Sequence, residues 1–322
     1  MMKKWLSVLI LLIIGITANA QNGFFFSHYM LNPSYFNPAW VGMEGKAFAA
    51  FQYRNQWLGY NSSFDGSGGA PSTQLLTLNI PVNGPISGIG ANISNDNLGP
   101  LNNIQGQFSV SAKWRFSMGT LSVGLMPGFF SQTEKFDELR FNDPEDPLNL
   151  GSRQTQIRPD LNAGIFFVMK NNIYIGVSAM NILEPSFNFG IDIDSAAFNN
   201  QFKRNYTGLI GTAIAFNQDL VIKPSVLIRS DLIGFTYDVS AIAIFKEKMW
   251  GGLSYRRSES AILLLGYSLL EDNVLKLGYS FDYVVNEQDA KQPTSHEIYI
   301  RYDIPDLIFG GKKIVKTPRF SF

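Results

Sequence analysis

The sequence contains no cysteine and only two histidines among its 322 residues. The lack of cysteine excludes disulfide bonds, thiol chemistry and a lipid attached to a cysteine behind a signal peptide. Neither His28 nor His296 has a serine at a spacing typical of nucleophilic hydrolysis, and two histidines are too few for a zinc site. We therefore expect no enzymatic activity, no cofactor and no metal site.

Long apolar runs and charge are also scarce. After residue 20 no stretch approaches the roughly 18 consecutive apolar residues that indicate a transmembrane helix. Charged residues make up 16% of the chain, against about 25% in a typical domain, and the net charge is zero. We expect no nucleic-acid partner, because such partners select basic surfaces. The acidic stretches 143–146 and 192–194 lie in predicted loops, where solvated carboxylates are a simpler reading than calcium ligands.

The first twenty residues have the features of a secretory signal peptide. Two lysines precede an apolar stretch at 6–16, and small residues at 18–20 offer a cleavage site. The apolar stretch is too short to span a bilayer, which disfavours the alternative of an uncleaved anchor helix. We expect a signal peptide at 1–20 and a mature chain that begins at Gln21.

The clearest regular pattern is the sequence NIQGQFSVSAKWRF at 103–116, in which apolar and polar residues alternate. Only a β-strand places alternate residues on opposite faces. The stretch suits a tilted membrane strand of about 9–11 residues better than a globular strand of about 5–6. In an exported chain that is poor in charge and 14% aromatic, this pattern indicates an outer-membrane β-barrel.

Looser versions of the same pattern recur and predict fourteen strands. They lie near 46–57, 73–81, 86–94, 103–116, 119–132, 159–170, 172–182, 204–216, 219–229, 232–245, 249–257, 260–269, 274–283 and 294–302.

The connections alternate in length. Short turns follow the even-numbered strands, at 82–85, 118–119, 170–172, 217–219, 246–248 and 271–273. Longer loops follow most odd-numbered strands, at 58–72, 95–102, 133–158, 183–203 and 284–293, while the links at 230–231 and 257–260 are shorter. A barrel with short periplasmic turns and longer external loops has this parity, whereas a soluble β-sandwich has no reason for it. We predict an all-β fold: a transmembrane, up-and-down antiparallel β-barrel over 46–304 with about fourteen strands, twelve or sixteen remaining open.

Charged residues within the predicted strands fall on one face. A charge that faces lipid near the midplane costs about 2–4 kcal/mol for Arg or Lys, so this face is expected to line the lumen. The mixed signs favour internal pairing and hydration over a selectivity role. The predicted lumen-facing charges are Arg54, Lys113, Arg115, Asp160, Lys223, Arg229, Asp238, Arg256, Lys276, Asp282, Glu297 and Arg301.

The segment 21–45 precedes the first strand and fits no regular element. Its core, FSHYMLNPSYFNPAWVG at 26–42, is aromatic but contains two Asn-Pro pairs, which favour turns. Exposed aromatic side chains would form an adhesive patch in water, so we expect them to be buried. Two arrangements remain open: a plug in the lumen or periplasmic mouth, or a strap packed on the rim. At the other end, the basic tail 305–322 is expected in the periplasm, where it could dock a partner.

Several segments resemble the PorP/SprF family of outer-membrane proteins. The stretch at 26–42 is similar to the family's opening pattern, although Trp40 stands where Tyr or Phe is expected. Further similar segments follow in order, namely 158–187, 223–229, 250–257, 275–283, 296–304 and KTPRFSF at the end, although the tail is less basic than the family pattern. The resemblance covers nearly the whole mature chain.

The resemblance implies a component of the type IX secretion system in the outer membrane, with roles in secretion, surface attachment and gliding motility. The partners it implies are outer-membrane lipid, secretion components and a cognate secreted protein such as an adhesin, which the loops 133–158 and 183–203 could dock. The alternative function is a passive channel or a transporter of hydrophobic compounds. The residues singled out for a plug or partner are Tyr29, Asn32, Pro33, Asn37, Pro38, Gly42, Lys312, Lys313 and Arg319.

Overall fold

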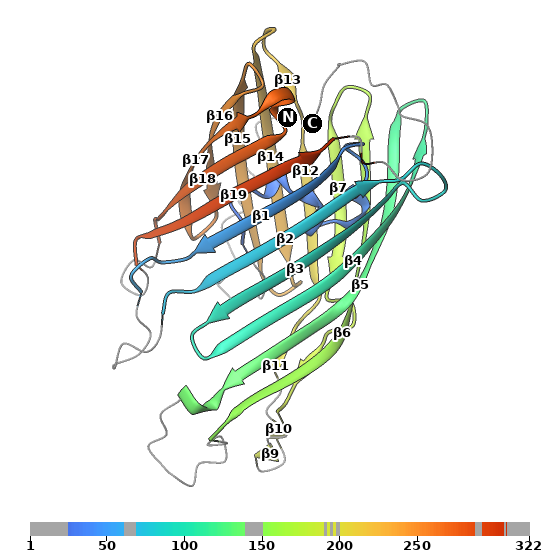
Figure 1. The fold of residues 1–322 in the computed structure, drawn as a ribbon. Helices are drawn as coiled ribbons and strands as arrows, with labels where there is room; N and C mark the ends of the chain where they lie inside the picture. The colour runs from blue at the N-terminus through green and yellow to red at the C-terminus, as the bar shows by residue number, and fades with distance from the viewer. Residues whose placement is uncertain are drawn as a thin grey trace, which may run out of the picture.

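The computed structural model describes residues 25–60, 69–138, 151–189, 192–193, 196–197, 200–286, 292–305 and 307. One antiparallel sheet closes on itself (Figure 1), because the strand β12 pairs with both β7 and β14. The two pieces β12 and β13 follow one another along the same edge of β14, so the wall has fourteen strand positions. The predicted fourteen-stranded barrel is confirmed.

The wall strands agree with the predicted ones to within a few residues, apart from two differences described below. They are β1 (Ala47–Asn55), β2 (Ser72–Pro81), β3 (Gly88–Leu98), β4 (Leu101–Arg115), β5 (Gly119–Lys135), β6 (Arg153–Met169), β7 (Tyr174–Met180), β12 (Asn205–Gly211), β13 (Ile214–Ala215), β14 (Leu220–Ser230), β15 (Phe235–Phe245), β16 (Met249–Arg256), β17 (Ser260–Leu269), β18 (Leu275–Val284) and β19 (Thr294–Ile304).

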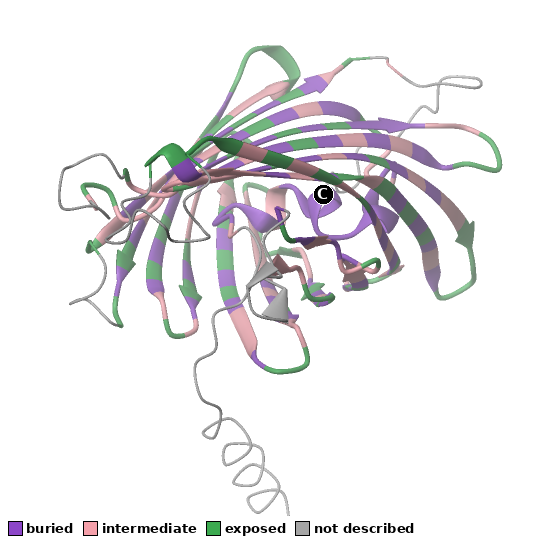
Figure 2. Ribbon diagram, turned by 90° about the horizontal axis from the view of Figure 1, so that it is seen from below, coloured by how far each residue is buried: buried purple, intermediate pink, exposed green. Residues whose placement is uncertain are grey.

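The alternation of apolar and polar residues in the sequence places apolar side chains on the outer face of the barrel and polar side chains on the inner face. Along β4 the side chains of Ile104, Phe108 and Trp114 are 38–50% exposed, while Gln105 and Ser109 between them are buried. Figure 2 shows the same purple and green banding on most strands. An apolar outer surface with a polar interior is the arrangement of a barrel in hydrocarbon.

Two strands differ from their predicted limits. β6 begins at Arg153, six residues before the predicted start at 159, and pairs with β5 out to Lys135. The added residues, RQTQIR, are mostly polar, so they carry no apolar alternation from which a strand could be recognised. The eighth predicted strand, 204–216, is interrupted between Gly211 and Ile214.

The predicted loop 183–203 contains short paired pieces. β8 (Ser186–Phe187) pairs with β11 (Asn200–Gln201), and β9 (Asp192–Ile193) pairs with β10 (Ala196–Ala197). Two 3-10 helices lie in the connections between strands: η4 (Phe136–Glu138) in a long loop and η5 (Glu271–Asn273) in a short turn. Within the described part of the chain no helix has the length and apolarity to cross a membrane.

Candidate functional site in the barrel lumen

Residues 25–46, here called the N-terminal segment, run through the interior of the barrel (Figures 1 and 2). The segment folds as three 3-10 helices, η1 (Tyr29–Leu31), η2 (Pro33–Tyr35) and η3 (Pro38–Trp40), and η3 contacts β4, β5 and β6. Five of its six large aromatic side chains are only 1–4% exposed, namely Phe26, Tyr29, Tyr35, Phe36 and Trp40, and Phe25 is partly buried. The barrel wall thus shields from water an aromatic surface whose exposure would be unfavourable.

Both Asn-Pro pairs form turns and hold the segment to the wall. Each proline occupies the first position of a 3-10 helix, and the asparagine before it has an extended φ of −138° or −142°. Asn32 Nδ2 donates to Gln52 Oε1 at 3.0 Å and to Thr77 Oγ1 at 2.9 Å. Asn37 Nδ2 donates to two wall carbonyls, of Ile165 and Val177, at 3.1 and 3.0 Å.

Glycines in the wall make room for the segment. A β-carbon at Gly124 would overlap the backbone of Pro38 and Ala39, and one at Gly164 would overlap the Asn37 side chain. Gly42 has a φ of +74° and lies against the backbone of Ser87 and Gly88. At these positions the wall and the segment lie so close together that a β-carbon on the glycine would overlap its neighbour. Only glycine fits there without a shift.

The aromatic side chains pack edge to face. Ring centroids are 5.7 Å apart for Phe26 and Tyr35, and 4.7 Å apart for Trp40 and Phe166 of β6. The Tyr29 hydroxyl lies 3.0 Å from Ser225 Oγ, and burial raises the pKa of this phenol. Each such aromatic pair contributes about 0.5–1.5 kcal/mol beyond the area it buries.

A first charged cluster holds the start of the segment in the half of the lumen nearer the long loops. The backbone N–H groups of Ser27 and His28 donate to the Glu297 carboxylate at 2.6 and 3.1 Å, and His28 Nδ1 lies 2.6 Å from Glu297 Oε1. Ser27 Oγ donates to Asp282 Oδ2 at 2.8 Å, and Arg54 donates to both Ser27 Oγ and Asp282. Buried carboxylates and an arginine therefore neutralise one another around the segment.

The same cluster extends to a second carboxylate. Arg256 Nε donates to Asp238 Oδ1 at 3.1 Å, and Arg229 donates to Asp238 Oδ2 at 3.3 Å. The ring of Phe25 lies over both guanidinium groups, with its centroid 4.0 Å from Arg229 Cζ and 5.2 Å from Arg256 Cζ. Two cation–π contacts thus anchor the first described residue of the segment.

A second charged cluster lies where the segment joins β1, at the end of the barrel with the short turns. Arg301 donates to Glu44 and, through Nε, to Asp303 Oδ1 at 2.6 Å, while Lys276 Nζ donates to Asp303 Oδ2 at 2.9 Å. Burial alone would raise the pKa of Glu44, but the Arg301 charge outweighs it and holds this pKa below its ordinary value. The Arg301–Glu44 pair thus links the last turn of the segment to β19.

Among the residues singled out in the sequence for a plug or partner, Tyr29, Asn32, Pro33, Asn37 and Pro38 are buried in the lumen, and Gly42 contacts the wall. The three tail residues, Lys312, Lys313 and Arg319, lie outside the described residues. Of the twelve charges assigned to the lumen, eight are at most 5% exposed: Arg54, Asp160, Arg229, Asp238, Arg256, Asp282, Glu297 and Arg301.

The other four charges lie toward the short turns. Lys113 donates to the Gly42 carbonyl at 2.9 Å, Lys276 pairs with Asp303, and Lys223 lines a cavity. Arg115 is exposed at the end of β4. Sequence reasoning missed Glu44, Asp303 and Glu259. The partner of Glu44, Arg301, is distant in sequence, whereas Asp303 and Glu259 pair with arginines only two and three residues away. The polarity of the inward register was the only available signal for Asp303.

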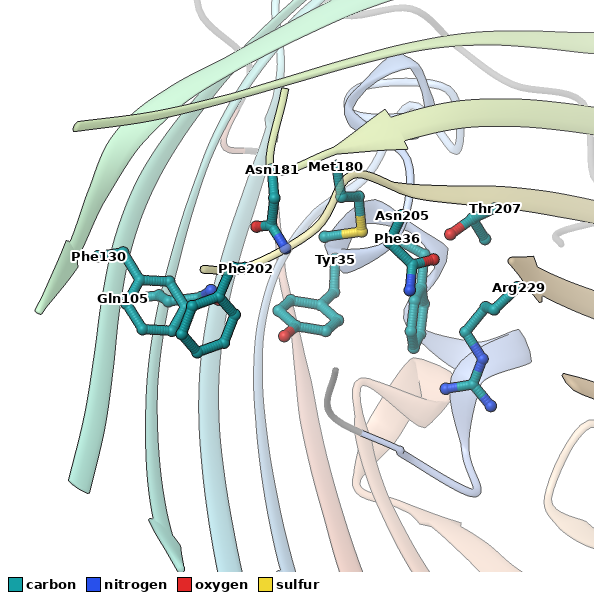
Figure 3. A pocket seen from close by; sticks show the side chains of 10 residues that line it. All are labelled: Tyr35, Phe36, Gln105, Phe130, Met180, Asn181, Phe202, Asn205, Thr207 and Arg229. Atoms are coloured by element: carbon teal, nitrogen blue, oxygen red, sulfur yellow. The ribbon is translucent and has the colours of Figure 1, made fainter. Parts of the chain in front are cut away.

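Two cavities lie on opposite sides of the N-terminal segment. The one nearer the long loops measures about 50 Å³ and is lined by Tyr35, Phe36, Phe130, Phe202 and Arg229 among others (Figure 3). The one nearer the short turns measures about 610 Å³. The segment separates them. In the described part of the chain no group of three or more metal-ligating side chains gathers.

Comparison with known proteins agrees with this architecture. The solved structures similar to this chain include the Ralstonia pickettii toluene transporter TbuX, at 10% identity and a TM-score of 0.51, covering 89% of this chain and 96% of that one. The CymD monoaromatic hydrocarbon channel is similar at 11% identity and a TM-score of 0.50, covering 90% and 95%. At these identities the likeness shows the fold alone. No curated protein matched the sequence.

The family comparison is more specific. The model of the type IX secretion system membrane protein PorP/SprF matches residues 18–302, which is most of the chain. The match includes the N-terminal segment and all strands of the barrel except the last residues of β19. Together with the barrel, it identifies an outer-membrane protein, and the resemblance noted in the sequence is confirmed. The chain belongs to the PorP/SprF family of type IX secretion system membrane proteins.

Proposed function

We propose that this protein is a non-catalytic, plugged barrel that acts in the export or surface anchoring of one cognate secreted protein, such as an adhesin used in gliding. Membership of a type IX secretion family supports the pathway. The observation that carries the proposal is the N-terminal segment, which occupies the lumen and is bound to the wall from several sides. A barrel filled in this way serves better as an anchor or a gated accessory than as an open pore.

The contacts favour a plug over a strap on the rim. Asn32 bonds to β1 and β2, whereas Asn37 bonds to β6 and β7. Phe25 and His28 meet charges on β14, β16 and β19. A strap would contact neighbouring strands at one end of the barrel, and these anchors are instead distributed around its circumference.

The end with long loops is the proposed docking surface for the secreted protein. There β4, β5 and β6 extend together: β5 pairs with β6 from Pro127–Leu161 out to Lys135–Arg153, and with β4 out to Glu134–Leu101. An aromatic cluster stiffens the base of the loops 133–158 and 183–203; its members are Phe130, Phe136, Phe187, Phe189 and Phe202. A rigid base with long loops above it is a common way to present a binding surface.

Processing after Ala20 is part of this proposal. Phe25 is already inside the lumen, bound to Arg229. Four residues extend at most about 14 Å, so a retained apolar segment at 1–20 would have to start within or next to the polar interior. Mass spectrometry of the purified protein should show Gln21 as the first residue, and a retained Met1 would contradict it.

In-cell crosslinking tests the partner role. A photoreactive amino acid placed at the exposed Ser152, just before β6, or at the exposed Arg153, its first residue, should crosslink to one exported surface protein. The same probe at Ser117, in a short turn at the opposite end, should not. Cells that lack the secreted partner provide the matched control. Crosslinks from both ends to unrelated membrane proteins, or none from the loop end, would contradict the proposed docking surface.

The second candidate function, a transporter of hydrophobic compounds, has one observation in its favour. The small cavity in Figure 3 has aromatic walls, and two similar structures are a toluene transporter and a monoaromatic hydrocarbon channel. Its volume of about 50 Å³ is nevertheless well below the roughly 150 Å³ in which a buried cavity takes up benzene. Uptake of toluene into vesicles containing the protein would favour this alternative.

A further inference from the structure

The cavity of about 610 Å³ between the N-terminal segment and the short turns has the size of a small-molecule site, which typically measures about 300–1,000 Å³. Met30, Leu31 and Trp40 of the segment close it toward the centre of the barrel. Turn residues at 217–218, 247 and 272–273 form its outer rim, so it opens toward the end that the short turns assign to the periplasm. A solute from the periplasm can therefore enter it while the segment stays in the lumen.

Two aromatic side chains of this cavity lie over glycines of the barrel wall. A β-carbon at Gly266 or Gly278 would overlap the Trp250 indole, and one at Gly211 would overlap the Tyr174 hydroxyl. Because no side chain lies beneath them, both rings pack closely against the wall strands. The space in front of the rings is thereby kept open, and the cavity has two fixed aromatic walls.

Charged side chains of both signs line the cavity, four cations and four carboxylates. They are Lys46, Lys223, Lys276, Arg301, Glu44, Glu247, Asp272 and Asp303. Arg301 pairs with Glu44 and Asp303, and Lys276 also pairs with Asp303. The side chains of Lys46, Glu247 and Asp272 are exposed, so water solvates them. Seven of the eight charges are therefore paired or solvated, which leaves Lys223.

Lys223 of β14 is half-buried and lies opposite Ile242 of β15 on the inward-facing register. Among the described residues it forms no hydrogen bond or ion pair. Two carboxylates attract its ammonium group from a distance and two cations repel it, namely Glu44 and Glu247 against Lys276 and Arg301. The ammonium group thus has an apolar neighbour and no anion in contact with it, although a buried charge is stable only when it is paired.

We propose that this cavity binds a small amphipathic monocarboxylate, a molecule with an aromatic or aliphatic body and one carboxylate. The carboxylate pairs with Lys223, and the body packs against Trp40, Tyr174 and Trp250, which line the same cavity. Apolar walls with few polar groups that fix the orientation of the ligand are typical of small-molecule sites. The exposed charges at the mouth have both signs, so the interior cation decides which charge the ligand carries.

Other occupants match this cavity less well. An uncharged hydrocarbon would leave the Lys223 ammonium group desolvated and without a partner. An inorganic anion would pair with Lys223 but leave the aromatic walls in water. A bound monocarboxylate would also contact Met30 and Trp40, and would therefore stabilise the state in which the segment occupies the lumen. This inference goes beyond the secretion role and is independent of it.

Isothermal titration calorimetry of the full chain in detergent micelles tests the chemistry, with 4-phenylbutyrate and the uncharged 4-phenylbutanol as probes. The carboxylate should bind at least tenfold more tightly than the alcohol. Lys223→Gln should remove this difference, because a carboxamide carries no charge. Lys248→Gln, in an exposed turn outside the cavity, is the matched control and should retain the difference. Equal affinities for both probes, no saturable binding of the carboxylate, or an unchanged preference in Lys223→Gln would overturn the proposal.

Photolabelling tests the location of the site. The photoreactive carboxylate 4-benzoylbenzoate should attach to residues that line the cavity, such as Met30, Ile242 or Trp250, and an excess of 4-phenylbutyrate should reduce this labelling at least tenfold. Leu265 on the outer face of β17 reports labelling from the micelle, which the competitor should not change. Mass spectrometry of the digested protein maps the labels. Labels confined to the outer face, or cavity labels that the competitor does not reduce, would overturn the proposal.

Discussion

His28 and Glu297 are 269 residues apart, yet His28 Nδ1 lies 2.6 Å from Glu297 Oε1. Both side chains are fully buried, and the same carboxylate accepts the backbone N–H groups of Ser27 and His28. One acidic residue on the last strand thus binds the start of the N-terminal segment through three hydrogen bonds. In a low-dielectric interior such bonds are strong, and their loss is costly.

Glu297→Gln should therefore loosen the segment. A carboxamide has one acceptor oxygen and no charge to match Arg54, so we expect a loss of about 2–3 kcal/mol. Heat- or urea-induced unfolding in detergent micelles measures this change. Glu271→Gln, in an exposed short turn, is the matched control and should change stability by less than about 0.5 kcal/mol. Equal shifts for the two variants would contradict the assigned role of Glu297.

Gly124→Ala tests the close approach of wall and segment. The added methyl group would overlap the backbone of Pro38 and Ala39, which cannot move as a flexible side chain would. We expect displacement of the segment, a destabilisation of about 1–3 kcal/mol and a rise in ion conductance. At Gly208 an added β-carbon would have its nearest neighbour 3.9 Å away, so Gly208→Ala is the control. Unchanged conductance in both would show that the segment does not depend on this contact.

The variants Arg256→Ala and Arg257→Ala compare the stability contribution of a buried arginine with that of an arginine outside the charged cluster. Arg256 is fully buried against Asp238 and Asp282, so its removal leaves each of these interior carboxylates with one cation fewer and should cost about 3–5 kcal/mol. Arg257 stacks on Phe235 outside this cluster and should cost about 1 kcal/mol or less. Unfolding midpoints in one detergent give both values. A larger effect at Arg257 would contradict the account of the charged lumen.

The Arg301–Glu44 pair predicts a pH dependence. Because the pKa of Glu44 is lower in the folded protein than its ordinary value of 4.5, ionised Glu44 stabilises the docked segment above that pH. This contribution is lost as the pH falls through the lowered value. Protease cleavage within the segment, followed from pH 7 to pH 3, should rise at the acid end. Glu44→Gln should remove that part of the pH dependence, and an identical profile in both proteins would contradict it.

Much of the barrel could be predicted from the sequence, because lipid on one side and a polar lumen on the other impose alternation on each strand. The prediction was wrong where this constraint ends, at the polar start of β6 beyond the hydrocarbon. The alternation of short turns and long loops predicted the up-and-down topology, because successive connections of such a barrel lie at opposite ends. Long-range pairs such as Glu44 with Arg301 left no sequence signal, because closure of the barrel alone brings them together.

The position of the N-terminal segment could be predicted only in part. Its aromatic content required burial, but composition did not distinguish a plug from a strap. That choice depends on the wall glycines, such as Gly164, and on buried acceptors spread around the barrel, whose roles appear only when all strands are assembled. The two Asn-Pro turns were visible in sequence, whereas their wall partners were not.

Single-channel conductance in planar bilayers tests the central claim most directly. The mature protein should show little or no conductance, since the N-terminal segment occupies the lumen. A variant that lacks residues 22–42, with its barrel verified by heat-modifiable migration and circular dichroism, should conduct at least tenfold more. An intact barrel that stays closed after this deletion would contradict the plug.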